Sequence, residues 1–198
     1  MTMTISLWLL WAVVIILALT VLALARQVGV LHERVAPAGA LLNGAGPGVG
    51  EPSPRLDLHA LAGNAITVGG SLPKGKALLM LFVSHTCPIC KKLIPVAQDF
   101  AQTERLEVFY VGDGELAKQH KLVAQLGIDP RRFVNGPEIG LAYRVDKLPY
   151  AVLLDDEGLI SAKGLVNSRE HLESLIIAKE TGFATLQSYL KAQPEATR

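Results

Sequence analysis

Two cysteines carry the most distinctive chemistry in this sequence. Cys87 and Cys90 are the only cysteines among the 198 residues, and only Pro88 and Ile89 separate them. A thiolate is a nucleophile, and two neighbouring thiols can form and break an intramolecular disulfide. The spacing therefore indicates a redox pair that exchanges disulfides with another protein.

The expected position of the pair, between a strand and a helix, gives the two cysteines different roles. Cys87 would lie at the helix N-terminus, where unpaired N–H groups and the helix dipole favour a thiolate. Pro88 suits the first helical turn because it has no N–H to leave unsatisfied. Cys90, one turn further on, would be more buried and placed to attack a mixed disulfide. We expect Cys87 to be the nucleophile and Cys90 the resolving cysteine.

Other uses of the cysteine pair fit the sequence less well. Zinc would need two further ligands, and a structural disulfide between near neighbours would close a very short loop. Peroxide reduction is an enzymatic alternative because Thr86 precedes Cys87, but the residues around the pair do not match the usual peroxidase signature. The histidines are scattered without ligand spacing: His32, His59, His85, His120 and His171. We therefore expect no metal and no cofactor.

His85 is the candidate for tuning the reactivity of the pair. It stands two residues before Cys87, and a protonated imidazole there would raise the thiolate fraction. The alternative is an ordinary solvated loop histidine. Lys91 and Lys92 would add positive potential or simply form a solvated helix face.

The chain around the cysteines alternates between strand-like and helix-like patterns. Residues 77–83 form an unbroken apolar run, which is typical of a central strand covered on both faces. Further strands are expected at residues 106–111, 150–154 and 159–163, and helices at residues 93–101, 115–126 and 167–179. This order predicts an α/β fold with a mixed sheet flanked by helices.

An apolar segment precedes this domain. Residues 1–25 contain no charged side chain, and residues 5–25 supply about the 20 apolar residues that a bilayer core requires. Trp8 and Trp11 lie near one end, as in an interfacial belt. A cleaved signal needs a basic start, a shorter apolar core and a small-residue cleavage site, and none of these is clear. We expect an uncleaved N-terminal transmembrane helix over residues 1–26; a cleaved signal and a buried core helix are the alternatives.

Composition divides the remainder of the chain. Residues 27–50 are expected to form a neck and a Gly/Pro-rich linker, residues 51–190 one folded domain, and residues 191–198 a polar tail. A single domain of this size suits the chain length. Nineteen basic and eighteen acidic residues leave a net charge of +1, so the chain lacks the strong positive field that nucleic acid requires. No nucleic-acid partner is expected.

With these residues in view, the chain resembles the membrane-tethered branch of the thioredoxin-like redoxins. The resemblance rests on the motif Cys87-Pro88-Ile89-Cys90, on Pro95 five residues after it, and on residues 50–54, 74–76 and 143–149. It implies a thioredoxin-like fold in which Pro149 is a cis-proline facing the cysteine pair and Leu148 offers backbone groups to a substrate strand. Thioredoxins usually carry a buried Asp on the strand before the motif, whereas residues 76–86 contain no carboxylate. Proton transfer must therefore be arranged differently.

The similarity extends over nearly the whole chain, including the neck at residues 31–40. The chain is similar to the methylamine utilisation protein D family, accessory proteins for the maturation of methylamine dehydrogenase. The resemblance implies a thiol–disulfide oxidoreductase acting in processing, disulfide formation or maturation of the small (beta) subunit of that enzyme, which is disulfide-rich and bears a quinone cofactor. It implies a single-pass anchor in the inner membrane lipid bilayer and a periplasmic redox domain. An integral membrane protein that exchanges electrons with this domain is a further candidate partner.

Two features favour opposite orientations of the domain. Arg26 and Arg34 follow the span and no basic side chain precedes it, which favours a cytoplasmic domain. Disulfides persist in the periplasm, and two charges are a weak determinant, so we expect a periplasmic domain. Residue types do not fix the reduction potential, so reductase, oxidase and isomerase activities stay open. A binding chaperone that holds its client beside Pro149 and a membrane-bound thiol peroxidase are the remaining alternatives.

Overall fold

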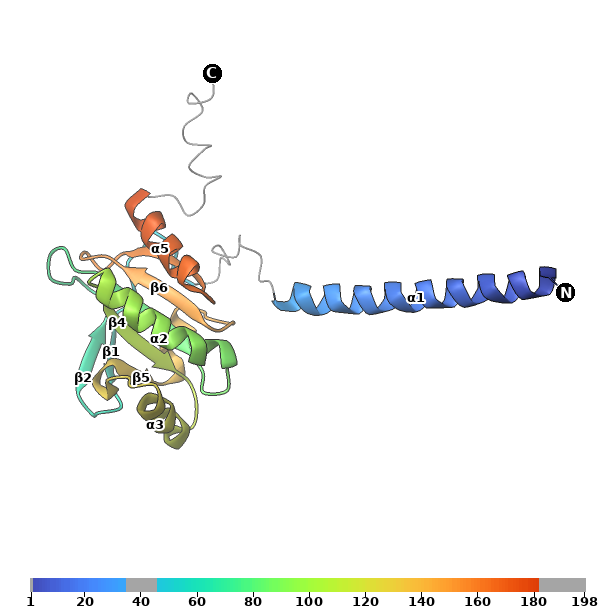
Figure 1. The fold of residues 1–198 in the computed structure, drawn as a ribbon. Helices are drawn as coiled ribbons and strands as arrows, with labels where there is room; N and C mark the ends of the chain where they lie inside the picture. Colours follow the sequence, from blue (N-terminus) through green and yellow to red (C-terminus); the bar gives the residue numbers. More distant parts are fainter. Residues whose placement is uncertain (1, 35–45, 182–198) are drawn as a thin grey trace, which may run out of the picture. The chain divides into compact units, whose positions relative to one another are not determined.

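The computed structural model describes residues 2–34 and 46–181, which fall into an N-terminal helix and a folded domain that form separate units (Figure 1). Helix α1, Thr2–Arg34, is continuous, and its segment Thr4–Leu22 is long and apolar enough to cross a membrane. The helix continues beyond the predicted span into residues 27–34 of the predicted neck. Residues 182–190 of the predicted domain, and the predicted tail 191–198, lie outside the described residues.

The domain is built on a five-stranded mixed sheet, as predicted, in the order β5-β4-β3-β6-β7. The central strand β3 pairs in parallel with β4 and antiparallel with β6. The strands are β3 (Leu78–Val83), β4 (Glu107–Gly112), β5 (Phe133–Asn135), β6 (Tyr150–Leu154) and β7 (Ile160–Leu165). Four of these were predicted from the sequence; the edge strand β5 was not.

Both faces of the sheet are covered. Every side chain of β3 is buried, and because successive side chains point to opposite faces, Leu79 and Leu81 join one core cluster while Met80 and Phe82 join the other. The first cluster is closed by α2 (Pro88–Thr103), α3 (Leu116–Gln125) and α5 (Arg169–Thr181), with α2 and α5 lying side by side in Figure 1. The second is closed by α4 (Pro137–Ala142) and a β-hairpin.

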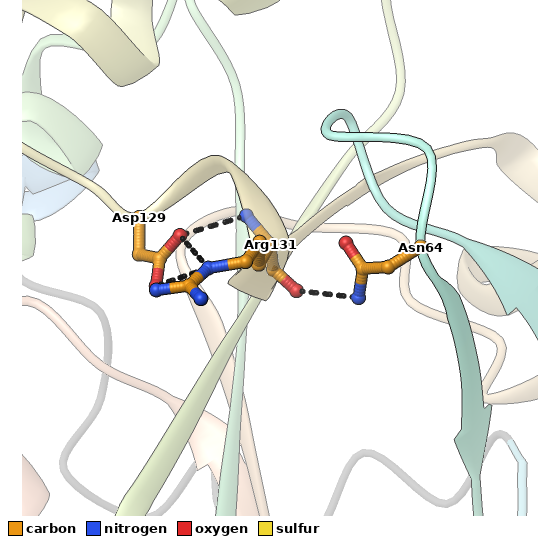
Figure 2. A network of polar contacts seen from close by, with 3 residues as sticks. All are labelled: Asn64, Asp129 and Arg131. Atoms are coloured by element: carbon orange, nitrogen blue, oxygen red, sulfur yellow. Dashed lines mark hydrogen bonds and ion pairs between the residues drawn. The ribbon is translucent and has the colours of Figure 1, made fainter.

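That hairpin consists of β1 (Leu56–His59) and β2 (Ala65–Val68) and covers the β5 edge of the sheet. Ala60 forms an antiparallel bridge with Val134 of β5. Figure 2 shows Asn64 at the tip, where its Nδ2 donates to the carbonyl of Arg131 at 3.5 Å. The Arg131 guanidinium is in turn ion-paired with Asp129 at 2.9 Å, at the 3₁₀ turn that leads into β5.

The opposite edge, β7, is covered by a segment that the sequence assigned mainly to the linker, residues 46–53. The backbone N–H of Gly50 donates to the carbonyl of Ile160 at 2.8 Å, and the N–H of Ile160 donates to the carbonyl of Glu51 at 3.0 Å. Lys163, on β7 and almost fully buried, donates from Nζ to the carbonyl of Pro47 at 2.7 Å. The chain is therefore bound to the sheet before residue 51.

Two buried tyrosines give a test of this packing. The hydroxyl of Tyr143 is hydrogen-bonded to the buried hydroxyl of Ser53. Tyr143→Phe removes this bond and leaves the Ser53 hydroxyl without its partner. The free energy of unfolding should therefore fall by about 1–2 kcal/mol. The melting temperature should fall by about 2–6 °C. The check is thermal unfolding of the full-length protein in mild detergent, followed by near-ultraviolet circular dichroism.

Tyr110→Phe is the matched control, because the buried hydroxyl of Tyr110 has no hydrogen-bond partner among the described residues. Its removal should leave the melting temperature unchanged or raise it. Equal destabilisation by both substitutions would contradict the importance assigned to the bond between Ser53 and Tyr143.

Candidate active site

The register of β3 gathers three loops at one end of the strands. This end is called the active edge below, and it is distinct from the side edges formed by β5 and β7. Val83, the last residue of β3, pairs with Gly112, the last residue of β4. Phe82 pairs with Tyr150, the first residue of β6. The loop after β3, the loop after β4 and the residues before β6 therefore lie at the same edge. These segments contain residues 84–87, 113–115 and 148–149.

A turn centred on Ser84 sets the position of Cys87. The hydroxyl of Ser84 is hydrogen-bonded to that of Thr86 at 2.9 Å and accepts the backbone N–H of Thr86 at 3.2 Å. The Ser84 carbonyl also accepts the N–H of Cys87 at 3.2 Å. Cys87 has extended backbone geometry and forms the N-cap of α2, with Pro88 at the first helical position as predicted.

The Cys87 sulfur occupies the place that a hydroxyl or carboxylate oxygen takes at most helix N-caps. Its Sγ accepts the backbone N–H of Cys90 at 3.1 Å, which is the bond that an N-cap side chain makes to the third helical residue. The N-terminal end of a helix favours an anionic group at this place. Both cysteines are free thiols; Cys87 is half-buried and Cys90 is fully buried.

Burial gives Cys90 a very different acidity from that of an ordinary thiol. It raises the pKa of Cys90 to about 12, and the hydrogen bond to Cys87 adds to the effect, while the backbone of Ser84 acts in the opposite direction. Cys90 therefore stays protonated at neutral pH unless a base takes its proton. An accessible sulfur at the helix terminus and a buried, protonated one behind it is the arrangement that the predicted nucleophilic and resolving roles require.

The predicted cis peptide bond is present between Leu148 and Pro149. Pro149 is buried and its carbonyl accepts the N–H of Val166 at 3.1 Å, while the Leu148 side chain is 40% exposed. Ile89, between the two cysteines, is 46% exposed. Exposed apolar side chains are therefore present in the first turn of α2 and in the segment before β6.

His85 is less solvated than a simple loop histidine would be. The residue is half-buried, and its Nδ1 is buried with no hydrogen-bond partner within the described part of the chain. The ring lies beside Gly114, in the loop after β4. Lys91 and Lys92 are both exposed on α2.

Two residues near the active edge, Asn135 and Gln119, were not singled out from the sequence. Asn135 binds the backbone of Gly114 twice, donating from Nδ2 to the carbonyl at 2.9 Å and accepting the N–H at 3.2 Å. Gln119, on α3, is fully buried, and both polar atoms of its amide lack a partner among the described residues. The signal for Gln119 was its position: it stands three residues before Leu122, on the stripe of α3 that faces the core.

The chain is 41% identical over 185 residues to methylamine utilization protein MauD of Methylorubrum extorquens, a match that covers 93% of this chain and 90% of that protein. It is 42% identical over 190 residues to MauD of Methylophilus methylotrophus, covering 96% and 90%. A family model described as TraF, F plasmid transfer operon protein, matches residues 73–149, which include both cysteines.

Among solved structures, the thioredoxin domain of a thiol-disulfide oxidoreductase from Bacteroides vulgatus matches with a TM-score of 0.54 and 20% sequence identity. The match covers 66% of this chain and 99% of that one. The domain therefore has a thioredoxin-like fold.

The difference between the two thiols predicts an order of alkylation. When the reduced protein meets iodoacetamide between pH 7 and 8, Cys87 should be modified first, because Cys90 is buried and its pKa is raised to about 12. Peptide mass spectrometry on a time course measures the order. A Cys87→Ser variant should take up label only slowly, and faster labelling of Cys90 than of Cys87 would show that the roles are reversed.

Proposed function

We propose that this chain, which belongs to the methylamine utilization protein MauD family, is a membrane-tethered thiol–disulfide oxidoreductase whose redox pair is Cys87 and Cys90. The observation that carries the proposal is the N-cap bond from the Cys90 N–H to the Cys87 Sγ at 3.1 Å, with the Cys90 side chain buried behind it. This arrangement presents one sulfur to a client and withholds the other until the first has reacted.

In the proposed cycle the Cys87 thiolate attacks one sulfur of a client disulfide. A bond forms between Cys87 and that sulfur, and the second client sulfur leaves as a thiolate. Cys90 then loses its proton and attacks the Cys87 sulfur, which closes the Cys87–Cys90 disulfide and releases the first client sulfur as a thiolate. The client gains two electrons and the cysteine pair loses two. Run in reverse, the same steps oxidise a client dithiol.

We assign Leu148 and Pro149 to substrate binding. The β3–β6 register supports this assignment because it places residues 148–149 at the edge that carries the cysteine loop. Leu148 is exposed there, which would let an extended client segment bind beside it, as in strand addition. Its side chain, with that of Ile89, adds apolar contact area.

The proposed client is the small (beta) subunit of methylamine dehydrogenase. The relatives named methylamine utilization protein support the pathway. By the family resemblance given above, that subunit is disulfide-rich, which suits the chemistry of a cysteine pair. Its disulfides must pair correctly before its cofactor can form, so a dedicated oxidoreductase would act during its maturation.

We place the anchor in the inner membrane and the redox domain in the periplasm. The apolar segment Thr4–Leu22 supports the anchor, and the persistence of disulfides in the periplasm supports the side.

A Cys90→Ala variant should trap the client. The mixed disulfide on Cys87 is then not resolved and should accumulate with the small subunit attached. The tagged variant is purified without reductant from acid-quenched cells grown on methylamine, and its adducts are identified by mass spectrometry. Recovery of many unrelated periplasmic proteins without the small subunit would contradict the dedicated role.

Two variants serve as controls for the trap. Cys87→Ser combined with Cys90→Ala should yield no adduct, because the attacking sulfur is gone. Cys87→Ser alone should abolish growth on methylamine but not on other carbon sources; normal growth on methylamine would favour a binding chaperone over an oxidoreductase.

Orientation is tested with fusions after Leu190. Alkaline phosphatase fused there should be active, because it folds with its disulfides only in the periplasm. A cytoplasmic reporter at the same position should be inactive. The opposite pair of results would place the domain in the cytoplasm, as Arg26 and Arg34 alone would favour.

A further inference from the structure

Helix α1 carries large aliphatic residues at a strict seven-residue repeat. One series consists of leucines: Leu10, Leu17, Leu24 and Leu31. A second series stands three residues before each leucine: Leu7, Val14, Val21 and Val28. In a heptad written abcdefg, the second series takes position a and the leucines take position d. These eight residues are called the seam below.

The seam is distinct from the rest of this apolar helix. Over residues 4–34, each of the other five heptad positions includes at least one small or polar residue. Only positions a and d hold a large aliphatic residue in every repeat from Leu7 to Leu31. One stripe of α1 is therefore uniform along the helix, whereas the other faces are mixed.

The repeat continues beyond the apolar span. The segment apolar enough to cross a membrane is Thr4–Leu22, but α1 remains one unbroken helix to Arg34 (Figure 1). Residues 26–34 are mostly polar, yet Val28 and Leu31 still fall at positions a and d; only Gly29 and Val30 depart from a polar pattern elsewhere. An apolar stripe on a helix that has left the hydrocarbon region favours a partner that removes it from water.

A second copy of this chain is the partner that suits the seam. The six seam residues whose side chains the structure describes are 47–63% exposed, and α1 forms a unit separate from the domain. Copies that cross the membrane in the same direction present their α1 helices in parallel. Valine at position a with leucine at position d is the combination that favours two parallel strands, and three of the four a residues are valine.

The size of the seam is sufficient for a stable dimer. From Leu7 to Leu31 it extends along about 36 Å of helix. If each seam side chain buries roughly 60–120 Å² of apolar surface, two seams bury roughly 1,000–1,900 Å². Stable protein interfaces bury about 1,200–2,000 Å². Within the bilayer the gain comes from close packing, because lipid tails are as apolar as leucine.

We propose that α1 is a dimerisation helix whose seam packs against the seam of a second copy in a parallel, two-stranded coiled coil. The coil is left-handed, because a straight helix of 3.6 residues per turn would carry a seven-residue repeat away from its partner. The inference rests on the proposed membrane anchor and not on the proposed redox chemistry. Each copy in the dimer keeps its own cysteine pair.

Disulfide crosslinking in membranes tests the seam directly. The background is the full-length protein with Cys87→Ser and Cys90→Ser, which has no other cysteine. Single cysteines are then introduced one at a time over residues 15–24, and the membranes are oxidised with copper phenanthroline. Non-reducing gels measure the yield of the linked dimer at each position.

The crosslinking yield should follow the heptad. Leu17→Cys, Val21→Cys and Leu24→Cys should give several-fold more dimer than Leu19→Cys and Leu22→Cys, which lie on the opposite face of the helix. A yield that is equal at all positions would indicate random collisions and would overturn the seam. So would a yield confined to the opposite face.

Two triple alanine variants provide a second, matched measurement. Alanine favours helix in both, and each variant loses a similar apolar volume. The seam variant is compared with a variant of the opposite face: Leu10→Ala, Leu17→Ala and Leu24→Ala against Ile15→Ala, Leu19→Ala and Leu22→Ala. Energy transfer between full-length copies labelled at the C-terminus, in lipid vesicles, measures the association.

The seam variant should weaken dimerisation about tenfold or more, because it removes close packing between the helices, whereas the control variant should leave it unchanged. Equal weakening by both variants, or an unmodified protein without energy transfer, would overturn the dimer. Photobleaching that shows more than two copies per complex would overturn the two-stranded form. Release of the unmodified chain from membranes by alkaline carbonate would overturn the anchor and the dimer together, while leaving the redox pair untouched.

Discussion

Strand β3 is hydrogen-bonded along both edges and covered on both faces, and the positions of the active-edge residues follow from this constraint. A strand so enclosed cannot slip by one residue without moving its apolar side chains into the wrong core cluster. Its fixed register sets where Val83 ends, and Ser84 then turns the chain so that Cys87 becomes the N-cap of α2. The same register brings Gly112 and Tyr150 to that edge.

The fold makes two chemically identical side chains unequal. Cys87 is half-buried at a helix terminus and accepts a backbone N–H, whereas Cys90, one turn along the same helix, is enclosed with the residues of the sheet core. Desolvation penalises the charged form of a thiol, and burial is the largest cause of the raised pKa of Cys90. The difference in pKa and exposure between the two thiols requires no carboxylate or metal. It follows from their positions, with Cys87 at the start of α2 and Cys90 one turn further into the core.

The parts of the fold that could be predicted are those with a strong periodic or apolar pattern. The run at residues 77–83 fixed β3, and the turn at Gly158 fixed the β6–β7 hairpin. Strand β5 was not predicted because its three residues are too few to show an alternating pattern. Its pairing with β4 also depends on contacts between residues that are distant in sequence. The cysteine pair was evident from spacing, and the cis bond at Pro149 only from family resemblance. Gln119 was missed because a single polar residue on an apolar stripe shows its burial only when the helix is packed.

Residues 46–53 do more than connect the domain to the N-terminal helix. They cover the outer edge of β7, which would otherwise be exposed. An open edge strand offers unpaired N–H and carbonyl groups to any other strand, including that of a second copy. Gly50 and Glu51 occupy those groups at Ile160, while Pro52 and Lys163 are residue types that discourage further pairing. Cutting the chain at Glu51 to obtain a soluble domain would remove part of this cover, and the shortened protein should self-associate through β7. Residues 46–53 therefore also protect the domain against aggregation through β7.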